Sequence, residues 1–146
     1  MQEVARQRLS NEEVVALCRA AAQACAREPS VVVAYLHGSV ARDEPARDID
    51  LALYFADVPS SAAMFASCAR VAAAIEAKTH PVLPLDVRPL NGASPPFRFA
   101  VLSEGRRLHV RSEDERVVLE ARWASEWHDF APFWHRQVDR VLGVSR

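Results

Sequence analysis

Two aspartates separated by one residue, Asp48 and Asp50, are the residues of this sequence best suited to hold a cation. They open a segment, 48–55, in which acidic and aliphatic residues alternate before the segment becomes wholly apolar, as in a strand with one end in solvent. Residues two apart on a strand point to the same side, so the two carboxylates lie together. Oxygen-only ligands suit Mg²⁺, which takes further ligands from water and substrate phosphates.

A third aspartate, Asp86, lies in another segment expected to form a strand, 82–90, and can complete the ligand set. Two Mg²⁺ ions about 3.5 to 4 Å apart would serve an in-line displacement at phosphorus. Asp86 would bind the first ion, which activates the attacking hydroxyl, and Asp48 and Asp50 would bind both. The second ion would hold a triphosphate and stabilise the pyrophosphate leaving group.

A Gly-Ser pair, Gly38 and Ser39, directly follows a β-branched and aromatic segment, 31–37, that is typical of a buried strand. Glycine permits a sharp turn and a close approach of the backbone to phosphate, and serine adds a hydroxyl and an N–H donor. Gly-Ser alone is common in ordinary turns, and Asp-x-Asp is common at solvated strand ends. Together, on neighbouring expected strands, they predict transfer of a nucleoside monophosphate from a nucleoside triphosphate.

The elements that must position these residues follow from the apolar periodicity. Ser10 and Glu13 form a capping-box pattern that opens a helix, Ser112 and Glu115 form another, and Pro132 should interrupt or kink the last helix. The pattern predicts an α/β (α+β) fold, with a small mixed β-sheet packed on helices. The expected helices are 11–27, 60–79, 97–103 and 112–141, and the expected strands are 31–37, 48–55, 82–90 and 106–110.

Length and charge limit the class of protein. At 146 residues, the chain is expected to form a single domain, with a core at about 31–110 and a helical carboxy-terminal part at 112–146. Eighteen basic and nineteen acidic residues give a net charge of −1, which offers no general attraction to nucleic acid. With no signal-peptide pattern and no apolar run of membrane-spanning length, we expect a cytoplasmic protein that does not enter a membrane.

The segments around the acids and the Gly-Ser turn resemble the nucleotidyltransferase superfamily related to DNA polymerase beta. The closer resemblance is to its minimal branch, the MNT domain of MntA-type antitoxins, and it extends from about residue 31 to residue 134. Its implied fold is a polymerase beta-like sheet with a helical carboxy-terminal part. The resemblance is carried by residues 35–42, 48–51 and 85–87, and then by 88–91, 96–99, 104–109 and 129–132.

Membership of that branch implies an antitoxin that transfers AMP from ATP to a tyrosine hydroxyl of a HEPN-fold toxin, an RNA-cleaving protein, and so neutralises it. The implied metal ligands and catalytic residues are Asp48, Asp50 and Asp86, with Mg²⁺ as the cofactor. Gly38 and Ser39 would seat the triphosphate. Arg42 would contact a phosphate, or would be only a solvated surface charge.

The sequence departs from the family pattern between the turn and the acids. Residues 40–47 make eight positions, where the family usually has about ten, and Arg47 stands where a serine usually precedes the first aspartate. A misplacement of about 1 Å can cost on the order of a hundredfold in rate. Two alternatives therefore stay open: a weakened antitoxin that acts by binding alone, and a nucleotidyltransferase that modifies a small hydroxyl compound.

Large aromatic residues recur at helical spacing near the end of the chain: Trp123, Trp127, Phe130 and Trp134. Such a stripe packs into a core in some proteins and forms an interface in others. If part of it is exposed, we expect the partner protein to bind there, because aromatic side chains concentrate binding energy at interfaces.

Overall fold

The structure is a computed structural model and describes residues 5–144. Helices and strands alternate through about three quarters of the chain, and one long helix follows. The short helix at residues 38–41 was not expected from the periodicity. The elements are α1 Asn11–Ala26, β1 Val31–His37, α2 Gly38–Ala41, β2 Ile49–Phe55, α3 Ser61–Thr79, β3 Leu85–Pro89, α4 Pro95–Glu104, β4 Arg106–Val110 and α5 Glu113–Leu142.

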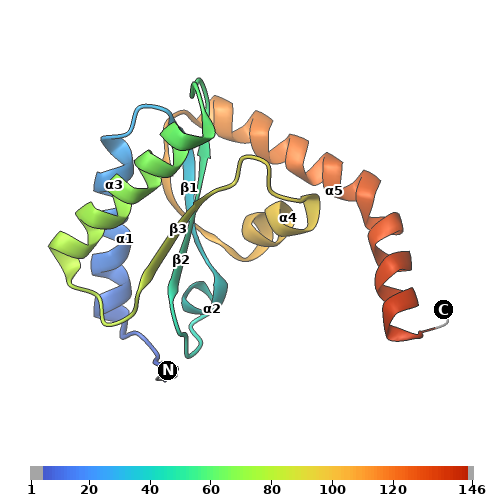
Figure 1. Cartoon of the computed structure of the whole chain (residues 1–146), viewed down its shortest axis with the longest axis horizontal. Coiled ribbons are helices and arrows are strands. Elements are labelled where there is room, and N and C mark those ends of the chain that lie inside the picture. Colours follow the sequence, from blue (N-terminus) through green and yellow to red (C-terminus); the bar gives the residue numbers. More distant parts are fainter. Residues whose placement is uncertain (1–4, 145–146) are drawn as a thin grey trace.

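The four strands form one mixed sheet in the order β3-β2-β1-β4, shown in Figure 1. Strand β1 is antiparallel to β2 and to β4, whereas β2 and β3 are parallel and are connected through α3. In this register Asp50 lies opposite His37 on one side and opposite Asp86 on the other. The expected small mixed sheet is confirmed, and its two central strands carry the Gly-Ser turn and the acidic pair.

Helices cover both faces of the sheet. Helices α1 and α3 pack over one face, where Leu36, Ile49 and Leu53 are fully buried. On the other face, α4 and the first part of α5 bury Tyr35 and Trp123. Strand β1 therefore supplies side chains to both cores, which explains why almost the whole of it is apolar.

The two capping boxes differ. At α1 both bonds form: the Ser10 hydroxyl accepts from the Glu13 N–H, and the Glu13 carboxylate accepts from the Ser10 N–H. At α5 the Ser112 hydroxyl accepts from the Glu115 N–H at 3.3 Å, but the Glu115 carboxylate pairs with the guanidinium of Arg111. The prediction of a second capping box is therefore confirmed for the Ser112 bond only, because Arg111 binds the Glu115 carboxylate instead.

Strand β3 is shorter than the expected 82–90. Residues 80–84 form an irregular segment, in which Leu83 is buried and the carbonyl of Pro84 accepts a hydrogen bond from the Ile49 N–H at 2.8 Å. Pro81 and Pro84 have no N–H group to donate to a neighbouring strand, and regular pairing with β2 begins only at Leu85.

Helix α5 continues through Pro132, so the expected interruption is wrong. Figure 1 shows instead that the helix changes direction in its second half, which fits the expected kink. A proline in a helix cannot donate to the carbonyl four residues before it, and its ring crowds that carbonyl, so the helix bends there. None of the helices described between residues 5 and 144 is both long and apolar enough to cross a membrane.

Candidate active site

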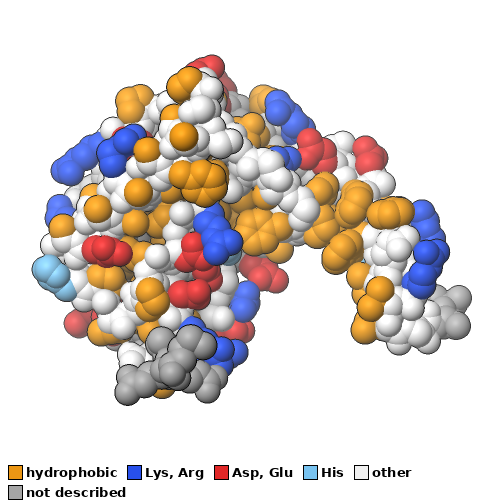
Figure 2. All heavy atoms as spheres, viewed as in Figure 1, with side chains coloured by type: hydrophobic (Ala, Val, Ile, Leu, Met, Phe, Trp, Pro, Cys, Tyr) orange, Lys and Arg blue, Asp and Glu red, His pale blue; other side chains and the backbone are white. Residues whose placement is uncertain are grey.

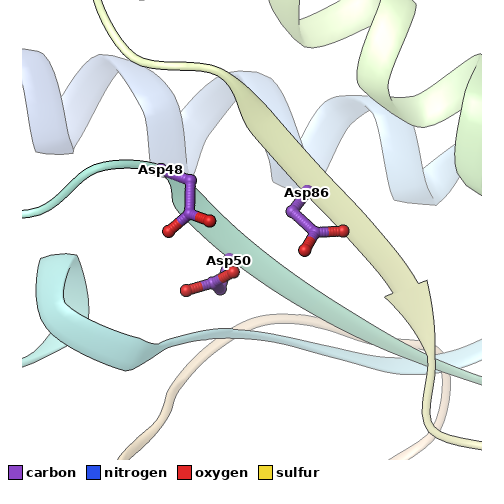
Figure 3. Close-up of side chains that lie close together, drawn as sticks. All are labelled: Asp48, Asp50 and Asp86. Carbon is purple, nitrogen blue, oxygen red and sulfur yellow. The ribbon is translucent and has the colours of Figure 1, made fainter. Parts of the chain in front are cut away.

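The three aspartates selected from the sequence lie together at one end of the sheet (Figure 3). Asp50 and Asp86 are register partners on the parallel strands β2 and β3, and Asp48 lies just before β2 begins. Each offers a carboxylate oxygen, and the three oxygens lie within 4.8 Å of one another. The parallel register of β2 and β3 thus brings an acid distant in sequence to the Asp48–Asp50 pair.

The electrostatics of this cluster favour a bound cation. Burial, followed by the negative charges of Asp48 and Asp86, raises the pKa of Asp50 to about 6. The neighbouring Arg88 opposes the shift. A group of three carboxylate ligands, without sulfur or nitrogen, fits Mg²⁺, whose charge would relieve the repulsion among them.

Gly38 brings the backbone directly against the acids. It follows β1, has a φ of +72°, and starts the single turn of α2. A Cβ atom at this position would lie 2.6 Å from Oδ2 of Asp50, which is closer than real Cβ contacts. Both its dihedral angle and its close approach therefore require glycine. Ser39 is the next residue of the same turn.

Arg42 ends α2, and its guanidinium is bonded to acids. It lies 3.2 Å from a carboxylate oxygen of Glu44 and 3.2 Å from one of Glu104, and it donates to the Ser39 hydroxyl at 3.5 Å. These partners and Arg42 itself are well exposed. Arg42 thus lies beside the Gly-Ser turn, where a bound phosphate would have to replace carboxylate partners.

The short span of residues 40–47 does not move the Gly38–Ser39 turn away from Asp50. Ala46 is buried and pairs with Gln7 through two backbone hydrogen bonds of 2.8 Å, which draws the span against the segment before α1. Gly38 remains in contact with Asp50 across the β1–β2 register. The Gly-Ser turn and Asp50 are therefore in contact even though the span between them is short.

A cavity of about 340 Å³ opens beside the acids. Its lining residues are His37, Asp50, Leu51, Asp86, Arg88 and Phe97.

Two of these lining residues received no role from the sequence. Arg88 donates from Nε to a carboxylate oxygen of Asp86 at 2.8 Å, and its spacing of two residues from Asp86 was the signal that could have placed it. Phe97 comes from α4 and packs edge-on against His37, with ring centroids 5.5 Å apart. No local pattern connects Phe97 to the acids. Burial lowers the pKa of His37.

The fold and the acids define a class of protein. Residues 20–114, more than half of the chain, match the family described as Polymerase beta, Nucleotidyltransferase. The chain belongs to this nucleotidyltransferase family.

Solved structures place its fold more narrowly. A mutant of the toxin–antitoxin pair MntA–HpeT contains a chain that is 18% identical, with a TM-score of 0.63 over 92% of this chain and 99% of that one. A toxin–antitoxin structure with AMP-PNP contains a chain that is 20% identical, with a TM-score of 0.61 over 92% of this chain and 99% of that one. A structure of a tri-AMPylated HEPN toxin from Shewanella oneidensis in complex with an MNT antitoxin contains a chain that is 20% identical. Its TM-score is 0.58, and the match covers 80% of this chain and 88% of that one.

At these identities the likeness concerns the fold, and it confirms the expected minimal nucleotidyltransferase architecture with its long carboxy-terminal helix. No curated protein matches the chain.

Proposed function

We propose that the chain is an MNT-type antitoxin of the cytoplasm, which transfers AMP from ATP to a tyrosine hydroxyl of a HEPN-fold toxin and so neutralises it. The observation that carries the proposal is the convergence of Asp48, Asp50 and Asp86 beside the Gly38 turn, in a chain of the nucleotidyltransferase family. This is the arrangement that phosphoryl-group chemistry with Mg²⁺ requires.

The similar structures support ATP as the substrate and a HEPN-fold protein as the partner. One was solved with AMP-PNP, an ATP analogue, and another contains a tri-AMPylated HEPN toxin together with its MNT antitoxin. Each covers at least 80% of this chain. The same chemistry in this chain would need ATP and a protein hydroxyl, and it would need no direct contact with nucleic acid.

Each site residue then has a role in the reaction. Asp48, Asp50 and Asp86 would hold Mg²⁺, and the bound metal would supply charge neutralisation for the triphosphate and for the attacking oxygen. Gly38 keeps the backbone close to Asp50, so the Gly38–Ser39 turn can receive the triphosphate beside the acids. Arg42 would exchange a carboxylate partner for a phosphate oxygen.

The transfer forms one bond and breaks one. The acceptor oxygen bonds to the α-phosphorus of ATP, the bond from that phosphorus to the bridging oxygen breaks, and pyrophosphate leaves. The hydroxyl proton passes to water or to a carboxylate of the site. Because the displacement is in line, the acceptor must approach from the side opposite the leaving pyrophosphate.

The test is transfer of labelled AMP from ATP to a co-expressed HEPN partner in the presence of Mg²⁺. We expect Asp48→Asn and Asp50→Asn to abolish labelling. Asp57→Asn is the matched control, since Asp57 follows the opposite end of β2 and its αL backbone also suits asparagine. If the wild-type chain neutralises its partner without transferring label, the proposed activity is wrong.

A second candidate is an antitoxin that acts by binding alone. The contact between Arg88 and Asp86 favours it, because a guanidinium already neutralises one of the three carboxylates. Under this candidate Asp48→Ala and Asp50→Ala would leave neutralisation intact in cells. Loss of neutralisation in these variants would support AMP transfer.

A further inference from the structure

The second half of α5 stands away from the sheet and its covering helices, as Figure 1 shows in red. We call residues 127–142 the arm. Leu119 and Trp123 are the buried residues of α5, and both lie before the arm. Within the arm, Phe133 is 49% exposed and Trp134 is 40% exposed. These are large apolar surfaces for a helix to present to water, and such patches mark interaction sites.

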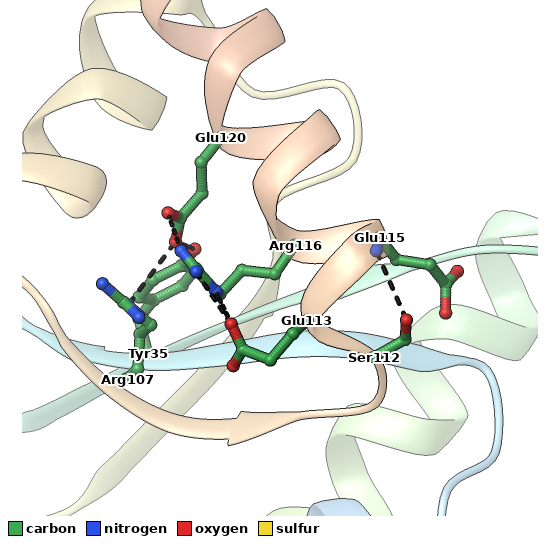
Figure 4. Close-up of polar contacts among 7 residues, drawn as sticks. All are labelled: Tyr35, Arg107, Ser112, Glu113, Glu115, Arg116 and Glu120. Carbon is green, nitrogen blue, oxygen red and sulfur yellow. Dashed lines mark hydrogen bonds and ion pairs between the residues drawn. The ribbon is translucent and has the colours of Figure 1, made fainter.

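The base of α5 is held firmly, so the direction of the arm is set by the fold. The Tyr35 hydroxyl on β1 donates to Glu120 at 2.6 Å, and Arg116 donates to the other Glu120 oxygen at 2.7 Å (Figure 4). Nearer the arm, Arg98 of α4 pairs with Glu126 at 3.3 Å while its side chain is mostly covered. Hydrogen bonds from two neighbouring elements thus fix the helix before it leaves the body.

Helix α4 carries one aromatic side chain beside the acids and another against the arm. Phe97 lines the cavity with Asp50 and is 42% exposed. On the same helix, Phe99 stacks on Trp127 at the start of the arm, with ring centroids 5.2 Å apart and an interplanar angle of 13°. Figure 2 shows hydrophobic side chains extending from beside the acidic cluster towards the arm.

Within the arm, Phe130 continues the series by stacking on Trp134 at 6.3 Å and by contacting Phe133 at 5.5 Å. The series therefore runs from the reacting centre to the far part of α5. We name it the aromatic face, which consists of Phe97, Phe99, Trp127, Phe130, Phe133 and Trp134.

We propose that the aromatic face is the docking surface for the acceptor protein, and that this partner binds through an apolar surface adjacent to the hydroxyl that receives AMP. The inference rests on the proposed function. Its main support is the position of α4, which places Phe97 in the cavity that contains Asp50 and Asp86 and stacks Phe99 on the start of the arm. An occupant of the arm is thereby brought next to the acids.

The chemistry of the arm favours a protein over a polyanion. Its two arginines and two aspartates, among residues 127–142, balance, so the arm offers no net attraction to phosphates. Exposed Trp and Phe side chains are the types that dominate protein interfaces.

The experiment uses the full chain and its purified HEPN partner, with two variants that place charge on the arm, Phe133→Glu and Trp134→Glu. Phe65→Glu is the control, since Phe65 is 58% exposed on α3, in the layer on the opposite face of the sheet. Partner affinity, ATP binding with Mg²⁺ and AMP transfer are measured for each. We expect both arm variants to weaken partner binding at least about tenfold, with ATP binding unchanged and the control equal to the wild type.

Three outcomes separate the inference from the proposed function. Wild-type partner affinity in both arm variants would overturn the docking surface, even if AMP transfer is normal. Tight partner binding that the arm variants abolish, without any AMP transfer by the wild type, would overturn the proposed activity and support the docking surface. A wild-type dimer that becomes monomeric in Trp134→Glu, with partner binding unchanged, would assign the arm to a second copy and overturn the inference.

Discussion

Gly38 lies so close to Asp50 that a Cβ atom on Gly38 would be 2.6 Å from the Oδ2 oxygen of the aspartate. Eleven residues lie between them in the sequence, and they meet because His37, the neighbour of Gly38, is the register partner of Asp50 across β1 and β2. The turn that would receive a triphosphate and the carboxylate that would hold its metal are thus in direct contact. A change at either residue should disturb the other.

Gly38→Ala should therefore damage the metal site. The new methyl group would push the Asp50 carboxylate away from Asp48 and Asp86, and a shift of about 1 Å is enough to reduce a rate on the order of a hundredfold. We expect a loss of Mg²⁺-dependent ATP binding of at least about tenfold, measured by isothermal titration, and a comparable or larger loss in AMP transfer.

Gly92→Ala is the control for this variant. Gly92 has a similar positive φ of +76°, but a Cβ there would meet nothing within 4 Å. Both alanine variants carry the αL strain of about 1 to 2 kcal/mol, so Gly92→Ala shows the effect of that strain alone. Only Gly38→Ala should lose ATP affinity, and equal ATP affinity in the two variants would contradict a role for the contact with Asp50.

The pKa of Asp50 predicts how the effect of Mg²⁺ depends on pH. Folding raises this pKa from 3.8 to about 6, mainly through burial. In the metal-free protein, the contribution of protonated Asp50 to the free energy of unfolding is fully present below pH 3.8 and is lost as the pH rises through about 6. Mg²⁺ binds only the ionised carboxylate, so stabilisation of the fold by Mg²⁺ should increase as the pH rises.

We therefore expect the increase in melting temperature on adding Mg²⁺ to be small at about pH 5 and larger at about pH 7.5. Thermal unfolding at both pH values, with and without Mg²⁺, measures this difference. In Asp50→Asn the increase should be small at both. An increase of equal size at the two pH values in the wild type would exclude Asp50 as a titrating ligand.

Arg42→Ala tests whether Arg42 contacts a phosphate. Its ion pairs with Glu44 and Glu104 are exposed, so their loss should change the free energy of unfolding very little. A lost charge-assisted bond to phosphate should weaken ATP binding about tenfold, equivalent to about 1.4 kcal/mol. The matched variant is Arg8→Ala, which removes an exposed pair with Asp43 on the neighbouring segment. If Arg42→Ala binds ATP as Arg8→Ala does, Arg42 is a surface charge.

The parts of the site that the sequence could predict are those in which local periodicity fixes direction. Asp48 and Asp50 could be paired because they are two apart at the start of an expected strand, and Asp86 could be assigned to a further strand by the same pattern. The strands, the α1 cap and the length of α5 followed from apolar spacing and capping chemistry.

The remainder depends on tertiary contacts that leave no local trace. Phe97 reaches His37 only because α4 packs beside the end of β1, and no spacing in the sequence encodes that approach. Glu115 was assigned to a capping box, yet Arg111 takes its carboxylate. The aromatic stripe of α5 divides between the two expected roles, since Trp123 is buried whereas Trp134 is 40% exposed, and only the three-dimensional path of the helix decides where the core ends.

The bond from Tyr35 to Glu120 should be one of the main links between the sheet and α5. The Tyr35 hydroxyl donates to Glu120 at 2.6 Å, and burial together with the adjacent carboxylate raises the pKa of Tyr35. In Tyr35→Phe the carboxylate keeps its contacts with Arg116 and Arg107, so it is not left without a partner. We expect a loss of about 1 to 2 kcal/mol in the free energy of unfolding, measured in urea.

Tyr54→Phe provides the comparison, because Tyr54 also packs on Trp123, with ring centroids 5.4 Å apart, but its hydroxyl forms no hydrogen bond with another residue among positions 5–144. That variant should unfold with nearly the wild-type free energy. Since Glu120 holds the base of α5, Tyr35→Phe should also weaken partner binding if the direction of the arm matters, whereas Tyr54→Phe should not. Equal unfolding free energies for the two variants would show that the Tyr35 hydrogen bond does not stabilise the attachment of the helix.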